Sequence, residues 1–545
     1  MRRHTKWLLP VAVAAALTLV VGPAATAGSE RAAAGTVVFI HDQEPPNLNQ
    51  GFVGNGLYTT SLVVNNIWLG GQIRDANAKW VLRNFAGKPK LVKQNPLTVS
   101  IEFKKNAVWS DGRPVTGADF RATWQVNVDP RNNIITRTGW EDIKSVKAAG
   151  KKATIVFKKP YASWESLVSG GVWAAHVVQG RNMNEAFADS IPVSNGPWKF
   201  QSWQKGVQLT VARNPRYTAG PRMVLDKLVF RYIVDTNARF QALKANEGQV
   251  MEPQPQLQIA EFQNDSKFKV DQKIGYTFEH LDIQLGAKGH PALKLPYVRQ
   301  ALITGMNRTQ IAQALYREIA PGLPKLDSLV FKPFESAYAK QFGGYAFNQK
   351  KVISILKGKG CTGGPTAPSA SNDDIFSCPG AGKLSFRFST TTGNQLRALT
   401  FEIVQRQLKS VGIELVPRFQ PAGLLFGTTL PSSDWDLIMF TYIQSPESKN
   451  AAKDLYACGG GQNYGNYCNK RATALLDKVA VSLDAAERDK LLDQVERQFL
   501  VKELPSIPLY ARPIYVIRAN GVRGPGVNPT QEGSPWNAST WRTAA

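Results

Sequence analysis

The side chains that most often perform catalysis in proteins are scarce and scattered in this sequence. Five histidines occur among 545 residues, so a Ser-His-Asp site has few candidates for its general base. The chain lacks the patterns G-x-S-x-G and H-E-x-x-H and a Walker loop, and no G-x-G-x-x-G turn opens a helix. His176 stands in an apolar context, which is typical of a core histidine rather than of a base. The sequence favours a binding protein over an enzyme, and we assign no catalytic residue, metal ligand or cofactor.

The first 27 residues have the features of a secretory signal peptide. A positively charged start is followed by the apolar residues 7–21 and by the small-residue cleavage site Ala25-Thr26-Ala27. The apolar run is shorter than the roughly 20 residues of a typical membrane-spanning helix, and no cysteine follows it to carry a lipid. We therefore predict an exported protein of the cell envelope or extracellular space, without a lipid anchor.

The four cysteines form two local pairs. Cys361 and Cys378 enclose a loop rich in Gly, Pro and Ser, whereas Cys458 and Cys468 enclose a loop with three consecutive glycines. An even number of cysteines in local pairs indicates disulfides in an exported chain. The alternative is a metal site, but no C-x-x-C occurs and the histidines are distant in sequence. We predict the disulfides Cys361–Cys378 and Cys458–Cys468.

The net charge of +25 raises the question of a nucleic-acid partner. Lys and Arg are, however, spread along the chain in small groups such as Lys104-Lys105 and Lys158-Lys159. No basic run or nucleic-acid-binding motif is present. The pattern favours a solvated basic surface suited to an anionic cell envelope, and we expect no nucleic acid among the partners.

Apolar periodicities place strands and helices alternately along the chain. Residues 98–103 alternate strictly, as in a strand with one buried face, and residues 401–411 are apolar at helical spacing up to Gly412. Thr116 and Asp119 form the pattern of a capping box at a helix start. A length of 545 residues implies two or three domains. The alternation predicts an α/β fold.

The segment Ser194–Phe200 contains a Gly-Pro turn beside Trp198, a combination that first suggests a binding site. A second strand pattern follows after Lys205-Gly206. Gly and Pro are typical of the turns that begin and end the strands of a hairpin. We interpret the segment as a turn and hairpin through which the chain returns to its first domain, with Trp198 packed rather than binding.

Several segments, taken in order, resemble the extracytoplasmic solute-binding proteins of ABC importers. The resemblance is to the peptide/nickel type, which includes dipeptide- and oligopeptide-binding proteins. The first matching motif is D-G-x-P-hydrophobic-T with its flanks, at residues 109–120. It is followed by the pair G-P-aromatic (194–200) and R-N-P-x-Y (213–217) and by an A-L-x-x-x-E segment (242–248). The last two are a V-R-Q-A segment (297–308) and a closing P-x-x-P-L-Y (504–510).

This resemblance implies a bilobal periplasmic-binding-protein-like fold of type II, in the large three-region form, with a ligand cleft between the lobes. The implied domains are a discontinuous first domain of residues 28–60, 190–280 and 505–545, an inserted domain of residues 61–189 and a second lobe of residues 281–504. The ligand would be enclosed by closure about a hinge.

The resemblance also implies that the second lobe supplies much of the ligand site. In the family's peptide binders an aromatic residue is followed three positions later by an Asp that pairs with the ligand's α-amine. Aligned from Trp435-Asp436, these positions are Tyr442 and Ser445, so the charged pair is missing unless Glu447 substitutes. We predict ligand contacts for Asn66, Trp68, Thr391, Thr392, Tyr442, Gln444, Ser445, Asn463 and Tyr464.

The leading hypothesis is an exported monomer that captures a peptide-like or other small polar solute and delivers it to the membrane subunits of an ABC importer. Two alternatives stay open. One is a secreted hydrolase on a related scaffold, which would need a nucleophile or an acid pair. The other is a basic envelope-interaction protein with a degenerate cleft, whose binding would be sensitive to salt.

Overall fold

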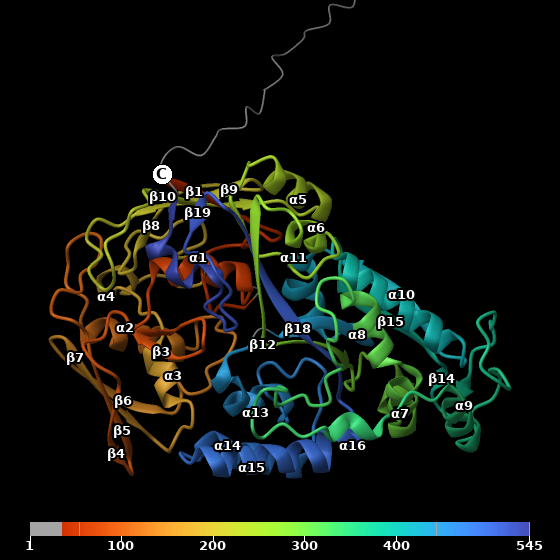
Figure 1. Cartoon of the computed structure of the whole chain (residues 1–545). Helices are drawn as coiled ribbons and strands as arrows, with labels where there is room; N and C mark the ends of the chain where they lie inside the picture. The colour runs from red at the N-terminus through yellow and green to blue at the C-terminus, as the bar shows by residue number, and fades with distance from the viewer. Residues whose placement is uncertain (1–34, 54, 443, 544–545) are drawn as a thin grey trace, which may run out of the picture.

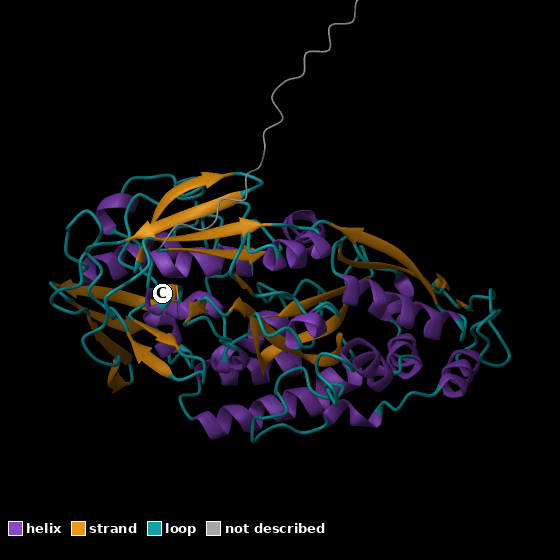
Figure 2. Ribbon diagram, turned by 45° about the horizontal axis from the view of Figure 1, so that its top comes forward, coloured by secondary structure: helices purple, strands orange, loops and turns teal. Residues whose placement is uncertain are grey.

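The computed structural model describes residues 35–53, 55–442 and 444–543. The signal peptide predicted for residues 1–27 lies outside this part. A mixed ten-stranded sheet runs through the molecule in the order β16-β15-β17-β12-β18-β11-β1-β10-β9-β8, and helices pack along it (Figures 1 and 2). The predicted alternation of strands and helices is confirmed.

The first lobe is the part built on one end of this sheet. Its strands are β1 (Thr36–His41), β8 (Trp198–Gln204), β9 (Gln208–Arg213), β10 (Lys227–Tyr232) and β11 (Val250–Met251), and its helices are α1 (Tyr58–Ile67), α5 (Thr236–Lys244) and α6 (Ile259–Gln263). The β8–β9 hairpin is the one predicted after the Gly-Pro turn.

A peripheral region shares its hydrophobic core with the first lobe. It contains a separate four-stranded sheet, ordered β4-β5-β7-β6, which lies at the left of Figure 1. Its elements are β2 (Gln72–Arg74), β3 (Trp80–Leu82), β4 (Lys90–Gln94), β5 (Leu97–Glu102), α2 (Gly117–Val128), β6 (Ile143–Ala149), β7 (Lys152–Phe157), α3 (Trp164–Ser169) and α4 (Ala175–Val178).

The second lobe is built on the other end of the ten-stranded sheet. Its main elements are α7 (Pro296–Gly305), α8 (Arg308–Tyr316), α9 (Gln349–Gly358), β15 (Ser385–Thr391), α10 (Gln395–Lys409), β16 (Glu414–Gln420), β17 (Leu437–Tyr442), α13 (Ala452–Tyr456), α14 (Lys470–Val481) and α15 (Ala485–Val495). Shorter elements are α11 (Ala422–Leu424), α12 (Leu430–Ser432), α16 (Val501–Glu503) and the pairs β13 (Ser377–Cys378) with β14 (Gly382–Lys383) and, near the chain end, β19 (Val522–Arg523) with β20 (Arg542–Thr543). The exact domain boundaries stay a prediction.

Two long antiparallel strands, β12 (Phe268–Ile283) and β18 (Ser506–Ala519), connect the lobes. The first half of β18 and the second half of β12 pair beside β17 of the second lobe, whereas the other end of β18 pairs with β11 of the first lobe. The register shifts between Ile274 and Phe278, so a bulge lies where the strands pass from one lobe to the other. The apolar pattern alone indicates a strand only from Phe278 to Leu285. The preceding residues include Lys269, Asp271 and Lys273, and they form a strand because they pair with β18.

The capping box predicted at the start of α2 is confirmed. The Thr116 amide donates to Asp119 Oδ2 at 2.7 Å, and the Ala118 amide donates to Thr116 Oγ1 at 3.3 Å. Asp119 Oδ1 also accepts from the Ala175 amide at 2.8 Å, which fixes α4 to α2. At α8 the cap is Asn307, whose Oδ1 accepts from the Gln310 amide at 3.0 Å.

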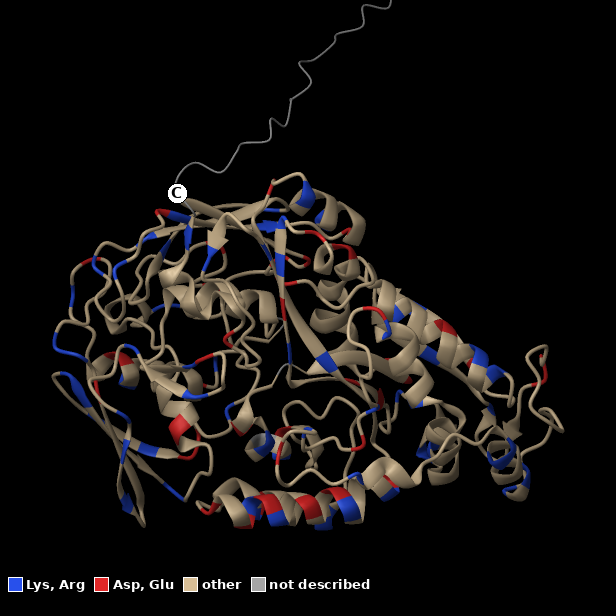
Figure 3. Ribbon diagram, viewed as in Figure 1, with Lys and Arg blue, Asp and Glu red and all other residues tan. Residues whose placement is uncertain are grey.

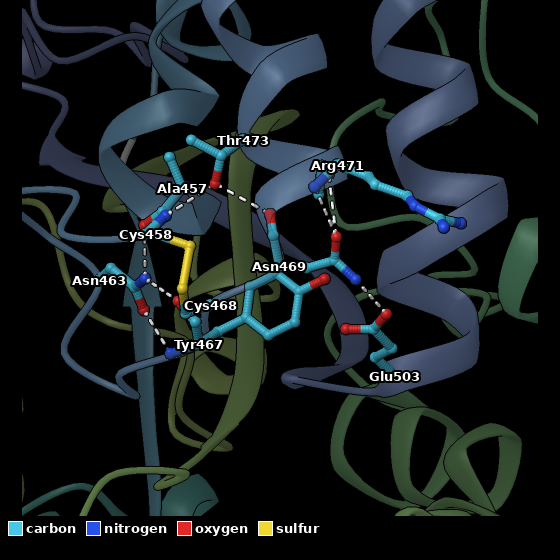
Figure 4. Close-up of a disulfide and its surroundings, with 10 residues drawn as sticks. Ala457, Cys458, Asn463, Tyr467, Cys468, Asn469, Arg471, Thr473 and Glu503 are labelled. Atoms are coloured by element: carbon cyan, nitrogen blue, oxygen red, sulfur yellow. Dashed lines mark hydrogen bonds between the residues drawn. A yellow bond between two sulfur atoms is a disulfide. The ribbon is translucent and has the colours of Figure 1, made fainter.

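Both predicted disulfides, Cys361–Cys378 and Cys458–Cys468, are present. The second closes the loop before α14, and Figure 4 shows Asn469 beside it at the start of that helix. Asn469 Oδ1 accepts from the Arg471 and Ala472 amides, and its Nδ2 donates to Glu503 Oε1 at 2.6 Å. The disulfide and the helix cap together hold the loop of residues 459–467 in place.

Figure 3 shows Lys and Arg distributed over both lobes, and along α14 and α15 they alternate with Asp and Glu. This distribution agrees with the scattered pattern seen in the sequence. Among the described residues, the helices are too short or too polar to cross a membrane.

We expect Thr116→Ala to lower the free energy of unfolding by about 1 kcal/mol, because the first turn of α2 loses its cap. Urea denaturation followed by tryptophan fluorescence would measure this change. The control is Thr366→Ala, which removes an exposed hydroxyl in the disulfide loop and should change stability by less than about 0.5 kcal/mol. Equal effects of the two substitutions would contradict the capping assignment.

Candidate functional site

A cavity of about 1020 Å³ lies between the two lobes. Helix α1 and the strands β2 and β3 supply one wall, and β17 with the chain that follows it supplies the opposite wall. Thr277 of the β12 bulge and Arg512 of β18 lie in the floor. Because the walls belong to different lobes, the shape of this cavity depends on how the lobes are placed about the two connecting strands. Volume and position are those of a small-molecule or short-chain binding site.

Both aromatic and amide side chains line the cavity. The aromatic residues of the wall are Tyr58, Trp68, Trp80, Trp140, Tyr161, Trp173, Phe426, Phe440, Tyr442 and Tyr464. Glutamine and asparagine side chains, among them Gln43, Gln50, Asn65 and Gln444, share the wall with them. Rings offer apolar contact area and amides offer both donors and acceptors. This lining suits a solute that has polar groups along its length.

A buried ion pair organises the floor. Arg397 of α10 donates from Nε to Glu279 Oε1 of β12 at 2.8 Å and from Nη1 to Thr391 Oγ1 at 2.8 Å. Thr441 of β17 donates to Glu279, and Arg512 Nη1 donates to Thr441 Oγ1 at 3.0 Å. Burial raises the pKa of Glu279, but Arg397 and Arg512 more than offset it and lower that pKa. The network ties five elements together beneath the cavity: the helix α10 and the strands β12, β15, β17 and β18.

Two contacts cross the cavity mouth between the lobes. Arg74 of β2, whose guanidinium lies 3.7 Å from the centre of the Trp80 ring, forms a salt bridge with Glu447. Asp454 of α13 accepts from Thr138 Oγ1 at 2.7 Å and from Thr136 Oγ1 at 3.3 Å. Burial raises the pKa of Asp454. These contacts belong to a closed arrangement, because opening the lobes would separate their partners.

Five of the predicted site residues lie on the cavity wall: Trp68, Tyr442, Gln444, Ser445 and Tyr464. The Trp68 ring packs edge-on against Phe187, and its Nε1 donates to the Val193 carbonyl at 3.2 Å. Tyr442 stacks on His280, with 4.5 Å between ring centres. Contact with a ligand stays a prediction for all five.

The other four predicted residues are not on this wall. Asn66 is buried and donates to the Leu62 carbonyl of its own helix, and Thr391 accepts from Arg397. Thr392 is exposed at the end of β15. Asn463 donates to the Ala457 and Tyr467 carbonyls (Figure 4) and lines a separate small cavity. Their polar groups serve the protein's own turns and helices, a use that sequence spacing does not distinguish from ligand binding.

Several residues of the site were missed by sequence reasoning. Arg512 follows the closing P-x-x-P-L-Y motif by two positions, which was an available signal. Glu532 lies in the C-terminal segment, and no pattern of the sequence places it near Ser445. Yet the Gln531 amide donates to Ser445 Oγ at 3.3 Å. Arg74 gave no signal either, because its position depends on the fold of the peripheral region.

The segment around the Gly-Pro turn lies away from the cavity. Ser194 Oγ donates to the Ile67 carbonyl at 2.8 Å, and the Leu69 amide donates to Asn195 Oδ1 at 2.8 Å. Trp198 is fully buried, so its predicted packing role is confirmed.

The interpretation of His176 as a core histidine was wrong. The side chain is partly exposed, and its Nε2 lies 2.9 Å from Oδ2 of Asp111 in the Asp-Gly turn. Within the described residues, no three of His, Cys, Asp and Glu gather as a metal site.

Comparison with known proteins gives a consistent result along most of the chain. A model of the family described as bacterial extracellular solute-binding proteins, family 5 Middle, matches residues 85–465. The oligopeptide-binding protein OppA of Mycobacterium tuberculosis is 23% identical over 517 residues, covering 90% of this chain and 85% of the relative.

Two solved structures share the fold. The periplasmic EDTA-binding protein EppA aligns with a TM-score of 0.83 and 20% identity, over 94% of this chain and 97% of its own. The oligopeptide-binding protein AppA from Bacillus subtilis, solved with a nonapeptide, aligns with a TM-score of 0.82 and 20% identity, over 95% and 100%. The predicted bilobal periplasmic-binding-protein-like α/β fold is confirmed.

We expect Arg397→Met to destabilise the protein by about 3–5 kcal/mol, because it leaves Glu279 buried without its partner. Exchanging both residues, as Glu279→Met with Arg397→Met, should recover most of that loss. Urea denaturation measures both effects. Arg406→Met, on the exposed face of the same helix, is the matched control. If Arg397→Met is as stable as Arg406→Met, the assigned role of the ion pair is contradicted.

Proposed function

The chain belongs to family 5 of the bacterial extracellular solute-binding proteins, and we propose that it captures a peptide-like or other small polar solute in the cavity between its lobes. The solute-binding proteins of this family serve ABC importers, and the membrane subunits of such an importer are the partners of this chain. The observation that carries the proposal is the cavity itself, with one wall from each lobe and a floor on the connecting strands.

Closure about β12 and β18 is the mechanism we propose for capture. Within the described part of the chain, only β12 and β18 of the central sheet run continuously past the boundary, and β12 carries a bulge there. Strand pairing resists separation of the lobes, whereas a bulge gives a place for bending. A solute that touches both walls stabilises the closed arrangement, together with the Arg74–Glu447 and Asp454–Thr138 contacts.

The proposed solute class follows from the lining and is supported by the relatives. Rings and amides together line a cavity of about 1020 Å³, which is large enough for several linked units. OppA of Mycobacterium tuberculosis is named as an oligopeptide-binding protein, and AppA of Bacillus subtilis was solved with a nonapeptide. An oligosaccharide, which also combines polar groups with apolar faces, is the other chemistry that the wall could accept.

We propose binding without turnover. The family is a class of binding proteins, which favours capture over the secreted hydrolase and over an envelope-interaction protein with a degenerate cleft. We further propose that the protein acts as a monomer, exported by the signal sequence of residues 1–27. The proteins of the family are extracytoplasmic, and this location agrees with the export signal.

A co-purifying solute should be seen by native mass spectrometry of freshly prepared protein. Added solute should also raise the thermal unfolding temperature, because a ligand at about 100 times its Kd stabilises by about 2.7 kcal/mol. The solute should leave the protein chemically unchanged after long incubation. Lack of any retained or stabilising solute across peptides, oligosaccharides and metal chelates would contradict capture.

We expect Ser445→Trp to abolish solute binding, because the added ring would fill the cavity from the wall of the second lobe. Calorimetric titration with the solute found by mass spectrometry measures the change. The control is Thr392→Trp, at an exposed position off the wall, which should keep the affinity. Binding that survives Ser445→Trp and fails in Thr392→Trp would place the site elsewhere.

A further inference from the structure

Glu532 differs from the other carboxylates of the cavity wall. Asp42, Glu252 and Asp454 each accept or pair through both oxygens, and Glu447 is engaged by Arg74. The carboxylate of Glu532 accepts a single long hydrogen bond among the described residues, from the Arg74 amide to its Oε1 at 3.4 Å. Among the described residues it forms no salt bridge. A carboxylate in a cavity wall with so little compensation is available to a ligand.

The segment that carries Glu532 is held on both sides of it. Before it, Asn528 Nδ2 donates to the Arg74 carbonyl at 2.9 Å, and Pro529 packs on Gly275 of the β12 bulge, where a side chain would collide. After it, the Ser534 amide donates to Glu252 Oε2 at 2.9 Å. Gly533 has a φ of +66° and no room for a Cβ beside Tyr58. The backbone that carries Glu532 is therefore fixed at the cavity before any solute arrives, which lowers the entropic cost of binding.

We propose that Glu532 binds a cationic nitrogen of the captured solute, such as the free amino group of a peptide. The inference rests on the proposed capture in the cavity and narrows its substrate class. Arg74 already pairs with Glu447, and Arg83, the other guanidinium that acts on Glu532, offsets the effect of its burial only in part. An ammonium group beside the carboxylate would form a charge-assisted hydrogen bond in a partly dry site, where such bonds are strong.

The electrostatics of the site favour binding of a cation beside Glu532. Burial raises the pKa of Glu532 to about 7, and the Arg74 amide, Arg83 and the Arg74 guanidinium oppose this only in part. The groups that face it are Arg74 and Arg83 from the β2–β3 region, Tyr58 from α1 and, through Arg74, Glu447 of the second lobe. A bound ammonium would favour the ionised carboxylate, so binding should release a proton near neutral pH.

The test compares penta-alanine with a free amino terminus and penta-alanine with an acetylated one, by calorimetric titration at pH 7. The free amine should bind at least about tenfold more tightly, as expected for a hydrogen bond to a charged group. Glu532→Gln, which keeps the shape, should reduce the free-amine affinity to that of the acetylated peptide. Glu318→Gln, which changes an exposed carboxylate, should keep the tenfold preference.

Moving the carboxylate provides a second test. Ser445 lies beside the segment, since its Oγ accepts from the Gln531 amide. Ser445→Asp in the Glu532→Gln background should restore the preference for the free amine. This restoration also shows that Glu532→Gln folds with an intact cavity. A preference that persists in Glu532→Gln alone, or equal binding of the two peptides by the unaltered protein, would overturn the inference.

The pH dependence separates this role from a structural one. Between pH 5.5 and pH 7 the amine stays mostly charged, while Glu532 must lose its proton to pair with it, so affinity should rise about tenfold. The rise should vanish in Glu532→Gln; if it stays, another group is responsible and the inference fails.

Failure of the inference can be told apart from failure of capture. A neutral probe, cellopentaose, is titrated in parallel. If cellopentaose binds and Ser445→Trp blocks it, while neither peptide binds, the cavity captures a solute and the cation site is overturned. If no probe binds and native mass spectrometry finds no retained solute, capture itself fails, and the assignment of Glu532 fails with it.

Discussion

The pairing of β12 with β18 is the constraint on which the rest of this structure depends. The two strands form the centre of the ten-stranded sheet and pass from one lobe into the other (Figure 1). Their backbone hydrogen bonds fix the lobes to a common axis, and the bulge between Ile274 and Phe278 interrupts that ladder at the boundary. A cavity whose floor is this crossing point must change its shape when the strands bend.

The chemistry of the floor and that of the walls differ for a physical reason. Beneath the cavity, Glu279 and Arg397 are almost fully buried and satisfy each other, together with Thr391 and Thr441. Burying such charges is costly unless every group is paired, so this part is a rigid base. In the walls, charged groups pair across the mouth, as Arg74 does with Glu447. Interactions of this kind are lost on opening, and they make the closed arrangement dependent on both lobes.

Much of the fold could be predicted from the sequence, but the site could be predicted only in part. The capping box of Thr116 and Asp119 and the two disulfides depend on residues close in sequence, and their patterns are explicit. The second-lobe wall around Tyr442 and Ser445 was found through a family resemblance. Glu532 could not be found, because its position follows from contacts with Gly275 and Glu252, hundreds of residues away. The first half of β12 could not be predicted for a related reason, since long-range pairing with β18, rather than its own apolar pattern, makes it a strand.

The most direct test of the account measures the distance between the lobes with and without solute. Spin labels on Lys147→Cys of β6 and Lys490→Cys of α15 would report it, because both side chains are exposed and the four native cysteines are engaged in disulfides. Electron–electron double resonance should give one narrow, short distance when the co-purified solute is present and a longer, broader distribution after it is removed. The same distribution in both states would contradict capture by closure about β12 and β18.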